Sequence, residues 1–328
     1  MVAAVVGPTY DPPPMTELHQ AVSTVVRRCL GVKAGEEVLV IADAETRAIG
    51  EALRDEAADL SADAVLAVME ERATDGTEPP RMLAAALGEC DVFITPTTRS
   101  LSHTTARKRA TDAGARGATM PGVTADMLGR VMAVDFDMMT ARSREVASLL
   151  ESATSARLTC PLGSDLTLDL TSRPGVADDG DLADRGAFGN LPCGEGFIAP
   201  VTGDGTIVAS SLSPLGISKE PATLTVRQGH IVAAECGLGP EYLDRLQAHG
   251  EPGTTIAELG VGTNDRATLT GNVLEDEKIL GTAHVAFGAS AGFGGTVSVP
   301  IHLDVVVLDA TLDIGATRVL DVGRYALR

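Results

Sequence analysis

Residues 35–70 read GEEVLVIADAETRAIGEALRDEAADLSADAVLAVME, and this stretch sets the fold class of the first half of the chain. Residues 35–44 contain a short apolar run that is typical of a buried strand. Residues 46–62 carry apolar side chains at helical spacing, and residues 63–70 form a second strand-like run. A strand, a helix and a strand in this order predict a parallel βαβ unit.

The same alternation continues to about residue 150. A helical segment at 79–90 precedes strand-like runs at 91–97 and 118–123, and an amphipathic helix follows at 136–153. We therefore predict a doubly wound, mostly parallel α/β domain over residues 1–154. The first strand is not followed by G-x-G-x-x-G, and the chain holds no P-loop, so the usual nucleotide-binding motifs are missing.

Short β-type segments separated by Gly, Pro and Asp replace this pattern in the second half. They lie at residues 164–172, 205–213, 222–236, 281–288, 297–309 and 317–327. Such a series predicts an α+β domain with a mostly antiparallel sheet over residues 155–328. The acidic run LEDEK at 274–278 is expected to be a solvated turn or the start of a helix.

The composition limits the classes of function. The 328 residues carry a formal net charge of −19, which opposes binding to nucleic acid or to anionic membranes. No apolar stretch reaches the ~18 residues of a membrane span, and residues 1–10 lack the basic start of a secretory leader. The five cysteines are Cys29, Cys90, Cys160, Cys193 and Cys236. They are scattered without a C-x-x-C pair, which favours a cytoplasmic protein over a disulfide framework.

The run VSVPIHLDVVVLD at 297–309 is apolar enough for a buried strand, yet it contains His302 and Asp304. Alternate side chains of a strand point to the same face, so these two lie together, opposite an entirely apolar face. A buried carboxylate costs several kcal/mol unless it is paired or binds a metal. The pair is therefore either a hydrogen bond that fills a gap in the core or part of a site.

Three further segments combine a ligand-type side chain with very small neighbours. Glu195 lies between two glycines, Glu258 shares a strand face with two glycines, and His284 shares one with an alanine and a glycine. Glycine within a strand often marks the close approach of a ligand. The candidate metal ligands are thus Glu195, Glu258, His284, His302 and Asp304. Two histidines and three carboxylates suit two divalent ions, zinc, cobalt or manganese, that share a bridging carboxylate.

Four ordered motifs resemble the M29 metallopeptidases, the aminopeptidase T family. They are NLPCGEGFIAP at 190–200, ELGVGTN at 258–264, GNVLEDEKILGTAHVAFG at 271–288 and IHLDVVV at 301–307. The resemblance covers most of the second half and, more weakly, residues 31–43. It implies an N-terminal α/β domain, a C-terminal metal domain, a homodimer, and metal ligands at the same five residues.

Two departures from that family bear on the reaction. The aminopeptidases carry an active-site tyrosine seven residues after the first histidine, where this chain has Ala291, and the chain is shorter than those peptidases. The same superfamily contains iron-dependent 2,5-dihydroxypyridine dioxygenases, which bind one Fe(II) through two histidines and a carboxylate. His284, His302 and Asp304 fit such a triad, or His249 replaces His284. In such an iron site Glu195 and Glu258 would have no role as metal ligands.

We predict a cytoplasmic, metal-dependent hydrolase that cleaves small peptides or amides at a dinuclear site. A metal-activated water would attack the scissile carbonyl, and Glu195 or Glu258 would carry the proton. The alternatives are the Fe(II)-dependent ring-cleaving dioxygenase and a catalytically silent protein that keeps the metal ligands.

Several other residues have two interpretations each. Cys193 is either a nucleophile or an inert loop cysteine. His103, in the basic segment SHTTARKR at 102–109, either recognises an anion or lies on a solvated helix face. Asn264 and Asn272 either hold substrate or form turns.

Overall fold

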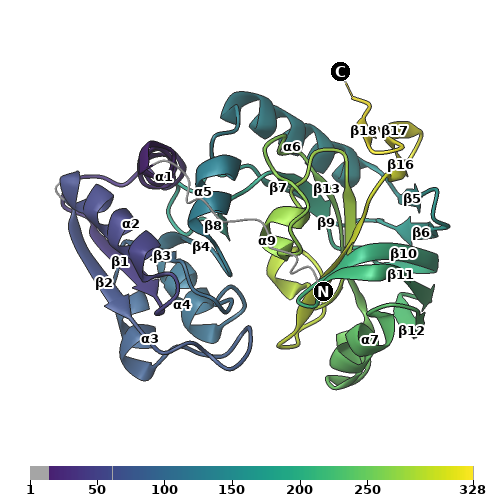
Figure 1. The fold of residues 1–328 in the computed structure, drawn as a ribbon, viewed down its shortest axis with the longest axis horizontal. Helices are drawn as coiled ribbons and strands as arrows, with labels where there is room; N and C mark the ends of the chain where they lie inside the picture. The colour runs from purple at the N-terminus through teal and green to yellow at the C-terminus, as the bar shows by residue number, and fades with distance from the viewer. Residues whose placement is uncertain (1–14, 61, 328) are drawn as a thin grey trace, which may run out of the picture.

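The computed structural model describes residues 15–60 and 62–327, so the predicted absence of a leader at residues 1–10 lies outside the described residues. Two sheets organise the chain, and Figure 1 shows them side by side with α9 (Val273–Asp276) between them. The first sheet is parallel and the second is a curled antiparallel sheet. The predicted fold class, α/β followed by α+β, is confirmed.

The parallel sheet, sheet A, has five strands in the order β2-β1-β3-β4-β8. They are β1 (Glu37–Ala42), β2 (Asp63–Val68), β3 (Val92–Thr95), β4 (Arg116–Thr119) and β8 (Phe188–Asn190). The first three lie within the predicted strand-like runs, whereas β4 shares only Ala118 and Thr119 with the run predicted at 118–123. The fifth comes from the second half of the chain and pairs with β4.

Helices cover both faces of sheet A because its central strands carry apolar side chains on both of their faces. Val38 and Val40 of β1 pack in one core with α2, whereas Leu39 and Ile41 pack in a second core on the other face. The helices of this half are α1 (Met15–Ser23), continued by the π-helix η1 (Thr24–Cys29), α2 (Arg47–Asp59), α3 (Arg81–Leu87), α4 (Thr105–Ala113), α5 (Ala125–Val131) and α6 (Phe136–Ser152).

The antiparallel sheet, sheet B, follows the order β18-β17-β16-β5-β6-β10-β15-β14-β13-β9-β7, with β11 and β12 added beside β10. Its strands are β5 (Ser155–Thr159), β6 (Asp165–Asp169), β7 (Gly175–Asp178), β9 (Glu195–Ile198), β10 (Thr202–Leu212), β11 (Gly216–Arg227), β12 (His230–Glu235), β13 (Ile256–Gly262), β14 (Ala283–Gly288), β15 (His302–Val307), β16 (Thr311–Ile314), β17 (Thr317–Asp321) and β18 (Arg324–Tyr325). The long helix α6 packs against β7 and β9.

The strand predicted at 297–309 begins only at His302. From there its faces alternate as expected, because Leu303, Val305 and Val307 point into the core of sheet B. Short helices complete this half: α7 (Gly239–Gln247), α8 (Gly250–Thr254), α9 and the 3-10 turn η2 (Ala291–Phe293).

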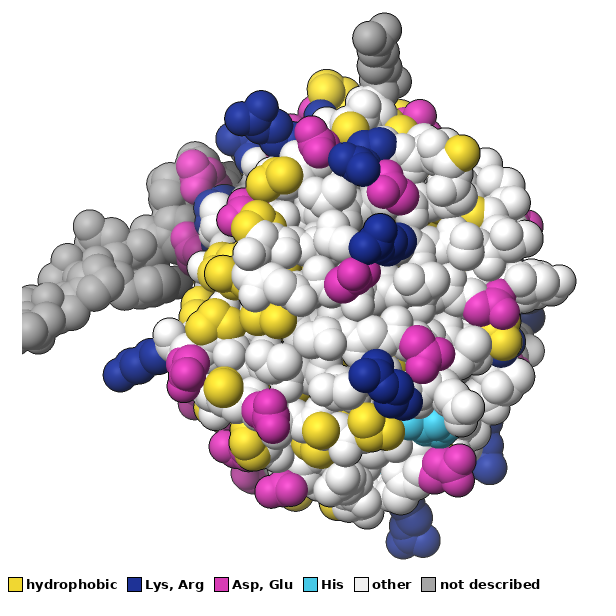
Figure 2. Space-filling model, turned by 90° about the vertical axis from the view of Figure 1, so that its right-hand side faces the viewer, with side chains coloured by type: hydrophobic (Ala, Val, Ile, Leu, Met, Phe, Trp, Pro, Cys, Tyr) yellow, Lys and Arg dark blue, Asp and Glu magenta, His cyan; other side chains and the backbone are white. Residues whose placement is uncertain are grey.

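The side of the molecule that lies to the right in Figure 1, where β5, β6 and β10 to β12 are labelled, carries charges of both signs. Figure 2 shows this face, on which lysine and arginine side chains stand singly among aspartate and glutamate side chains. Within residues 15–60 and 62–327, no helix has the length and apolarity needed to cross a membrane.

Candidate metal centre

The five predicted metal ligands lie on four neighbouring strands of sheet B, toward the end of the sheet formed by β9 and β7. Glu195 begins β9, Glu258 is in β13 and His284 is in β14. His302 and Asp304 are the first and third residues of β15. Because β9, β13, β14 and β15 are adjacent in the sheet, residues separated by more than 100 positions meet at one place.

Each of these side chains lies opposite a glycine or an alanine on a neighbouring strand. The pairs are Glu195 with Gly262, His284 with Gly260, Glu258 and Asp304 with Ala286, and His302 with Gly288. At Gly260 the space is fully used, since a Cβ atom there would lie 2.0 Å from Nε2 of His284. The small residues therefore form the room in which the larger side chains converge.

His284 and His302 are the centres of two groups of close contacts. Nε2 of His284 lies 3.0 Å from Oε2 of Glu195 and 3.2 Å from Oε1 of Glu258. Nε2 of His302 lies 3.4 Å from Oε2 of Glu258 and 3.6 Å from Oδ1 of Asp304. Glu258 thus bridges the two histidines.

The protonation of this cluster reflects its burial. Burial raises the pKa of Glu258, but hydrogen bonds from His284 and His302 outweigh it and lower the pKa to about 2. Burial opposes charge on both histidines, yet the surrounding carboxylates hold their pKa values well above the usual range. A divalent cation bound by the same atoms would displace these protons, because a metal requires neutral imidazole.

Three further observations fit a metal ion. Oε2 of Glu195 is buried and its contact with Nε2 of His284 lacks hydrogen-bond geometry, and Oδ1 of Asp304 is buried without a hydrogen-bond partner among the described residues. Nδ1 of His302 lies 2.7 Å from the carbonyl oxygen of Ala289. A proton on Nδ1 would be donated to that carbonyl, which leaves Nε2 free to bind a cation, as in most histidine metal ligands.

Lys278 and two acidic residues beside it belong to the same site, and sequence analysis missed them. The side chain of Lys278 is only 1% exposed. Its Nζ lies 2.5 Å from Oε1 of Glu195, 2.7 Å from Oε1 of Glu277 and 3.4 Å from Oδ2 of Asp178. Burial raises the pKa of Asp178 to about 7 and that of Glu277 to about 8. The positive charge of Lys278 lowers both pKa values, and the negative charge of Glu195 raises them further.

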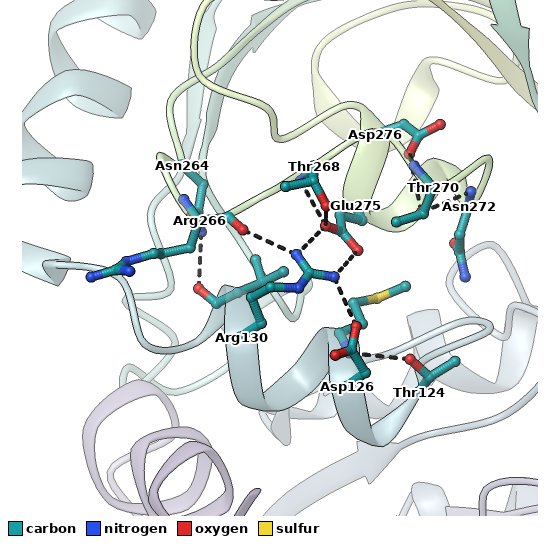
Figure 3. A network of polar contacts seen from close by, with 12 residues as sticks. Thr124, Asp126, Arg130, Asn264, Arg266, Thr268, Thr270, Asn272, Glu275 and Asp276 are labelled. Atoms are coloured by element: carbon teal, nitrogen blue, oxygen red, sulfur yellow. Dashed lines mark hydrogen bonds and ion pairs between the residues drawn. The ribbon is translucent and has the colours of Figure 1, made fainter. Parts of the chain in front are cut away.

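The run LEDEK at 274–278 was expected to be solvated, and this expectation is wrong. Residues 274–276 lie in α9, so the expected helix is present, but Glu275 and Asp276 are fully buried. Figure 3 shows why these charges are stable there. Glu275 accepts hydrogen bonds from Arg130 of α5 and from Thr268, and Asp276 accepts them from the backbone of Thr270 and Gly271. The motif at 271–288 included these acidic residues and Lys278, but so many charges in five residues indicated exposure to solvent.

A wall of aromatic and imidazole rings borders the site on one side. His103, which precedes α4, lies with its ring centroid 5.7 Å from that of His302. Phe293 of η2 packs edge-on against His302 at 5.8 Å and against Phe197 at 5.3 Å. His103 remains exposed to solvent, although the protein around it and the charges of His302 and Arg107 lower its pKa. The site therefore receives a side chain from each half of the chain.

The other sequence candidates lie apart from the chemistry. Cys193 is buried, and this burial raises its pKa well above 9.0, which makes it a poor nucleophile. Asn264 donates to the carbonyl oxygens of Cys193 and Val131, and Asn272 caps α9 and donates to Gly122. Both asparagines thus have the turn role. His249 is exposed at the start of α8, whereas His284 is buried within the site.

Comparison with known proteins gives the chain its relatives. The family model described as NicX, 2,5-dihydroxypyridine 5,6-dioxygenase, matches residues 17–326. Among solved structures, the 2,5-dihydroxypyridine dioxygenase of Pseudomonas putida KT2440 is similar at 20% identity and a TM-score of 0.79, over 96% of this chain and 99% of that one. AmpT of Thermus thermophilus is similar at 18% identity and a TM-score of 0.70, over 95% and 99%.

None of the curated proteins matches the chain. The two structures are too distant in sequence to establish more than a common fold, which the dioxygenase and AmpT share with this protein. The family match, by contrast, extends over both sheets and all five predicted ligands. The chain therefore belongs to the 2,5-dihydroxypyridine 5,6-dioxygenase family.

Proposed function

We propose that this protein is a metal-dependent dioxygenase that opens the ring of a dihydroxylated pyridine and adds both atoms of dioxygen to it. The family match over residues 17–326 carries the proposal, because it spans nearly the whole chain and both sides of the site. This reaction was the alternative in the sequence analysis, and the family membership now favours it over peptide hydrolysis.

The metal ligands of the proposed enzyme are His284, His302 and Asp304. Two histidines and one carboxylate suit non-haem iron, which when bound would supply the redox chemistry between dioxygen and the ring. The carbonyl of Ala289 orients His302 through Nδ1. Glu258 lies against both histidines and would hold their orientation or complete the ligand set.

The ring wall supports an aromatic substrate. Phe293 and His103 stand beside His302, and a planar heterocycle next to the metal would pack against them. His103 is exposed beside the ring of His302, so the hydroxyl of a substrate next to the metal would lie within its reach and could pass a proton to it. A proton acceptor of this kind assists attack of the electron-rich ring on oxygen.

Amide hydrolysis is the second candidate. The observation that favours it is the presence of Glu195 and Glu258 at the site, since an iron triad does not need two more carboxylates. The fold of AmpT is compatible with it. Which glutamate would carry a proton stays a prediction.

The test uses protein loaded with Fe(II) without oxygen and then mixed with 2,5-dihydroxypyridine in an oxygen electrode. We expect oxygen uptake in proportion to loss of the ring absorbance. Asp304→Asn removes the anionic ligand with almost no change in volume and should abolish both signals. His103→Ala should keep the iron and lower turnover by about 10²–10⁴-fold, the usual contribution of a general base.

Short peptides and aminoacyl amides serve as the competing substrates, in the presence of zinc, cobalt or manganese. Release of free amine from them, with the dihydroxypyridine inert, would replace the dioxygenase by the hydrolase. Inactivity toward both classes, with metal bound, would favour the silent binding protein.

A further inference from the structure

The site contains two groups of side chains that can each hold a cation. One consists of Glu195, Glu277 and His284, and the other of Glu258, His284 and Asp304. In each group the ligand atoms lie within 4.8 Å of one another, and His284 belongs to both. By geometry alone, these residues could therefore hold two neighbouring metal ions, of which His284 binds one, because a single imidazole nitrogen binds one ion and carboxylates must supply the ligands of the other.

The first group already contains a cation from the chain itself. The ammonium of Lys278 contacts Oε1 of Glu195 at 2.5 Å and Oε1 of Glu277 at 2.7 Å. The second group differs: among the described residues, Glu258 and Asp304 have ion-pair contacts only with histidines. The two groups thus offer the same kinds of ligand, but only the first has an ammonium group that already neutralises its carboxylates.

Lys278 is fixed in this position. Its backbone nitrogen donates to the carbonyl of Glu275 at 2.9 Å, and its carbonyl accepts from the backbone nitrogen of Asn264 at 2.9 Å. The side chain is 1% exposed, so the ammonium has no route to solvent without opening the structure. Asp178, 3.4 Å away, adds a third carboxylate around it.

We propose that Lys278 acts as a permanent cation in the first group and limits the centre to one metal ion, held by His284 and Asp304 of the second group together with His302. This inference rests on the proposed metal-dependent function and names the residue that sets the number of ions. An ammonium neutralises carboxylates as a metal ion does, but it offers no coordination position to substrate or water. Chemistry is then confined to the side of the site that faces His302.

The experiment counts ions in three proteins: the wild type, Lys278→Met and Lys278→Arg. Met keeps most of the volume and removes the charge, whereas Arg keeps a charge and is the matched control. Each metal-free protein is dialysed against excess Mn²⁺, and the bound ions are counted by elemental analysis. Electron paramagnetic resonance then reports whether two neighbouring Mn²⁺ ions are magnetically coupled.

We expect about one ion per chain in the wild type and in Lys278→Arg, and about two coupled ions in Lys278→Met, as in two-metal sites. Two ions in the wild type would overturn the inference and leave a metal enzyme in place. One ion in a folded Lys278→Met would overturn it as well, because the charge would then not be the cause.

If Lys278→Met fails to fold, the wild-type count still decides between one ion and two. No bound ion in the wild type would overturn both this inference and the proposed function. Failure of the dihydroxypyridine assay alone would leave the ion count, and hence the role of Lys278, intact.

Discussion

Gly260 has no side chain, and the imidazole of His284 fills the place where one would be. The two residues face each other across β13 and β14, and a Cβ atom would lie 2.0 Å from the ligand nitrogen. This relation was predictable from sequence, because glycine beside a buried ligand-type residue in a strand indicates a close approach. His103 was not predictable in this way, since it reaches the site from the other sheet.

Gly260→Ala should displace His284 and weaken metal binding by about 10–100-fold, the effect of disturbing a ligand's surroundings. The metal-induced rise in melting temperature measures this loss, because a ligand stabilises the folded state by an amount that grows with the logarithm of its affinity. Gly292→Ala is the control, since its Cβ atom would meet nothing within 4 Å. Equal metal affinity in the two variants would contradict the steric role of Gly260.

At the scale of elements, α9 joins the two halves of the protein. Its residue Glu275 pairs with Arg130 of α5, and the residues that follow it, Glu277 and Lys278, reach into the site. The sequence indicated a helix start here but not its burial. Local charge predicts exposure unless partners are known, and Arg130 lies 145 positions away in the chain.

Arg130→Met should destabilise the protein by about 3 kcal/mol, because the fully buried Glu275 loses its charged partner. Urea unfolding gives the free energy, and metal affinity should fall with it as α9 loses its anchor. Arg266→Met is the control: this side chain is exposed, and we expect a change within about 0.5 kcal/mol. A similar loss in both variants would argue against the α5–α9 contact.

For the whole molecule, the sequence predicted both sheet types, but not the distribution of the site between the halves. The hydrophobic periodicity of a strand indicates which of its faces is buried. The contact of His103 with His302 depends instead on how the two halves of the chain pack together. The homodimer and the role of Glu195 or Glu258 in proton transfer stay predictions. The pH dependence of stability, in contrast, follows from paired groups away from the site.

Glu36 illustrates this dependence. Burial raises its pKa, but hydrogen bonds from Arg116 and from the backbone of Lys33, together with nearby positive charge, outweigh burial and lower the pKa below its ordinary 4.5. A lowered folded-state pKa gives stability that is present above 4.5 and is lost as the pH falls through the folded value. Glu36→Gln should therefore cost about 2 kcal/mol near neutral pH.

That cost should shrink toward zero as the pH falls from neutral to below the folded-state pKa, because both states of the wild type are then protonated. Urea unfolding of the wild type and the variant at the two pH values measures the difference. Glu37→Gln, at an exposed neighbouring position, should change stability little at either pH. A cost of Glu36→Gln that persists in acid would show that packing, and not charge, is responsible.

Because β8 comes late in the chain, sheet A is completed late during synthesis. Sheet A lacks its fifth strand until residues 188–190 have left the ribosome, long after β4 has emerged. By then α6 and β5 to β7 are already outside the exit tunnel. Glu195 follows β8 by five residues, so completing the first sheet delivers the first ligand of the centre to the second. Synthesis thus completes sheet A just before it supplies Glu195, the first of the five candidate ligands in chain order.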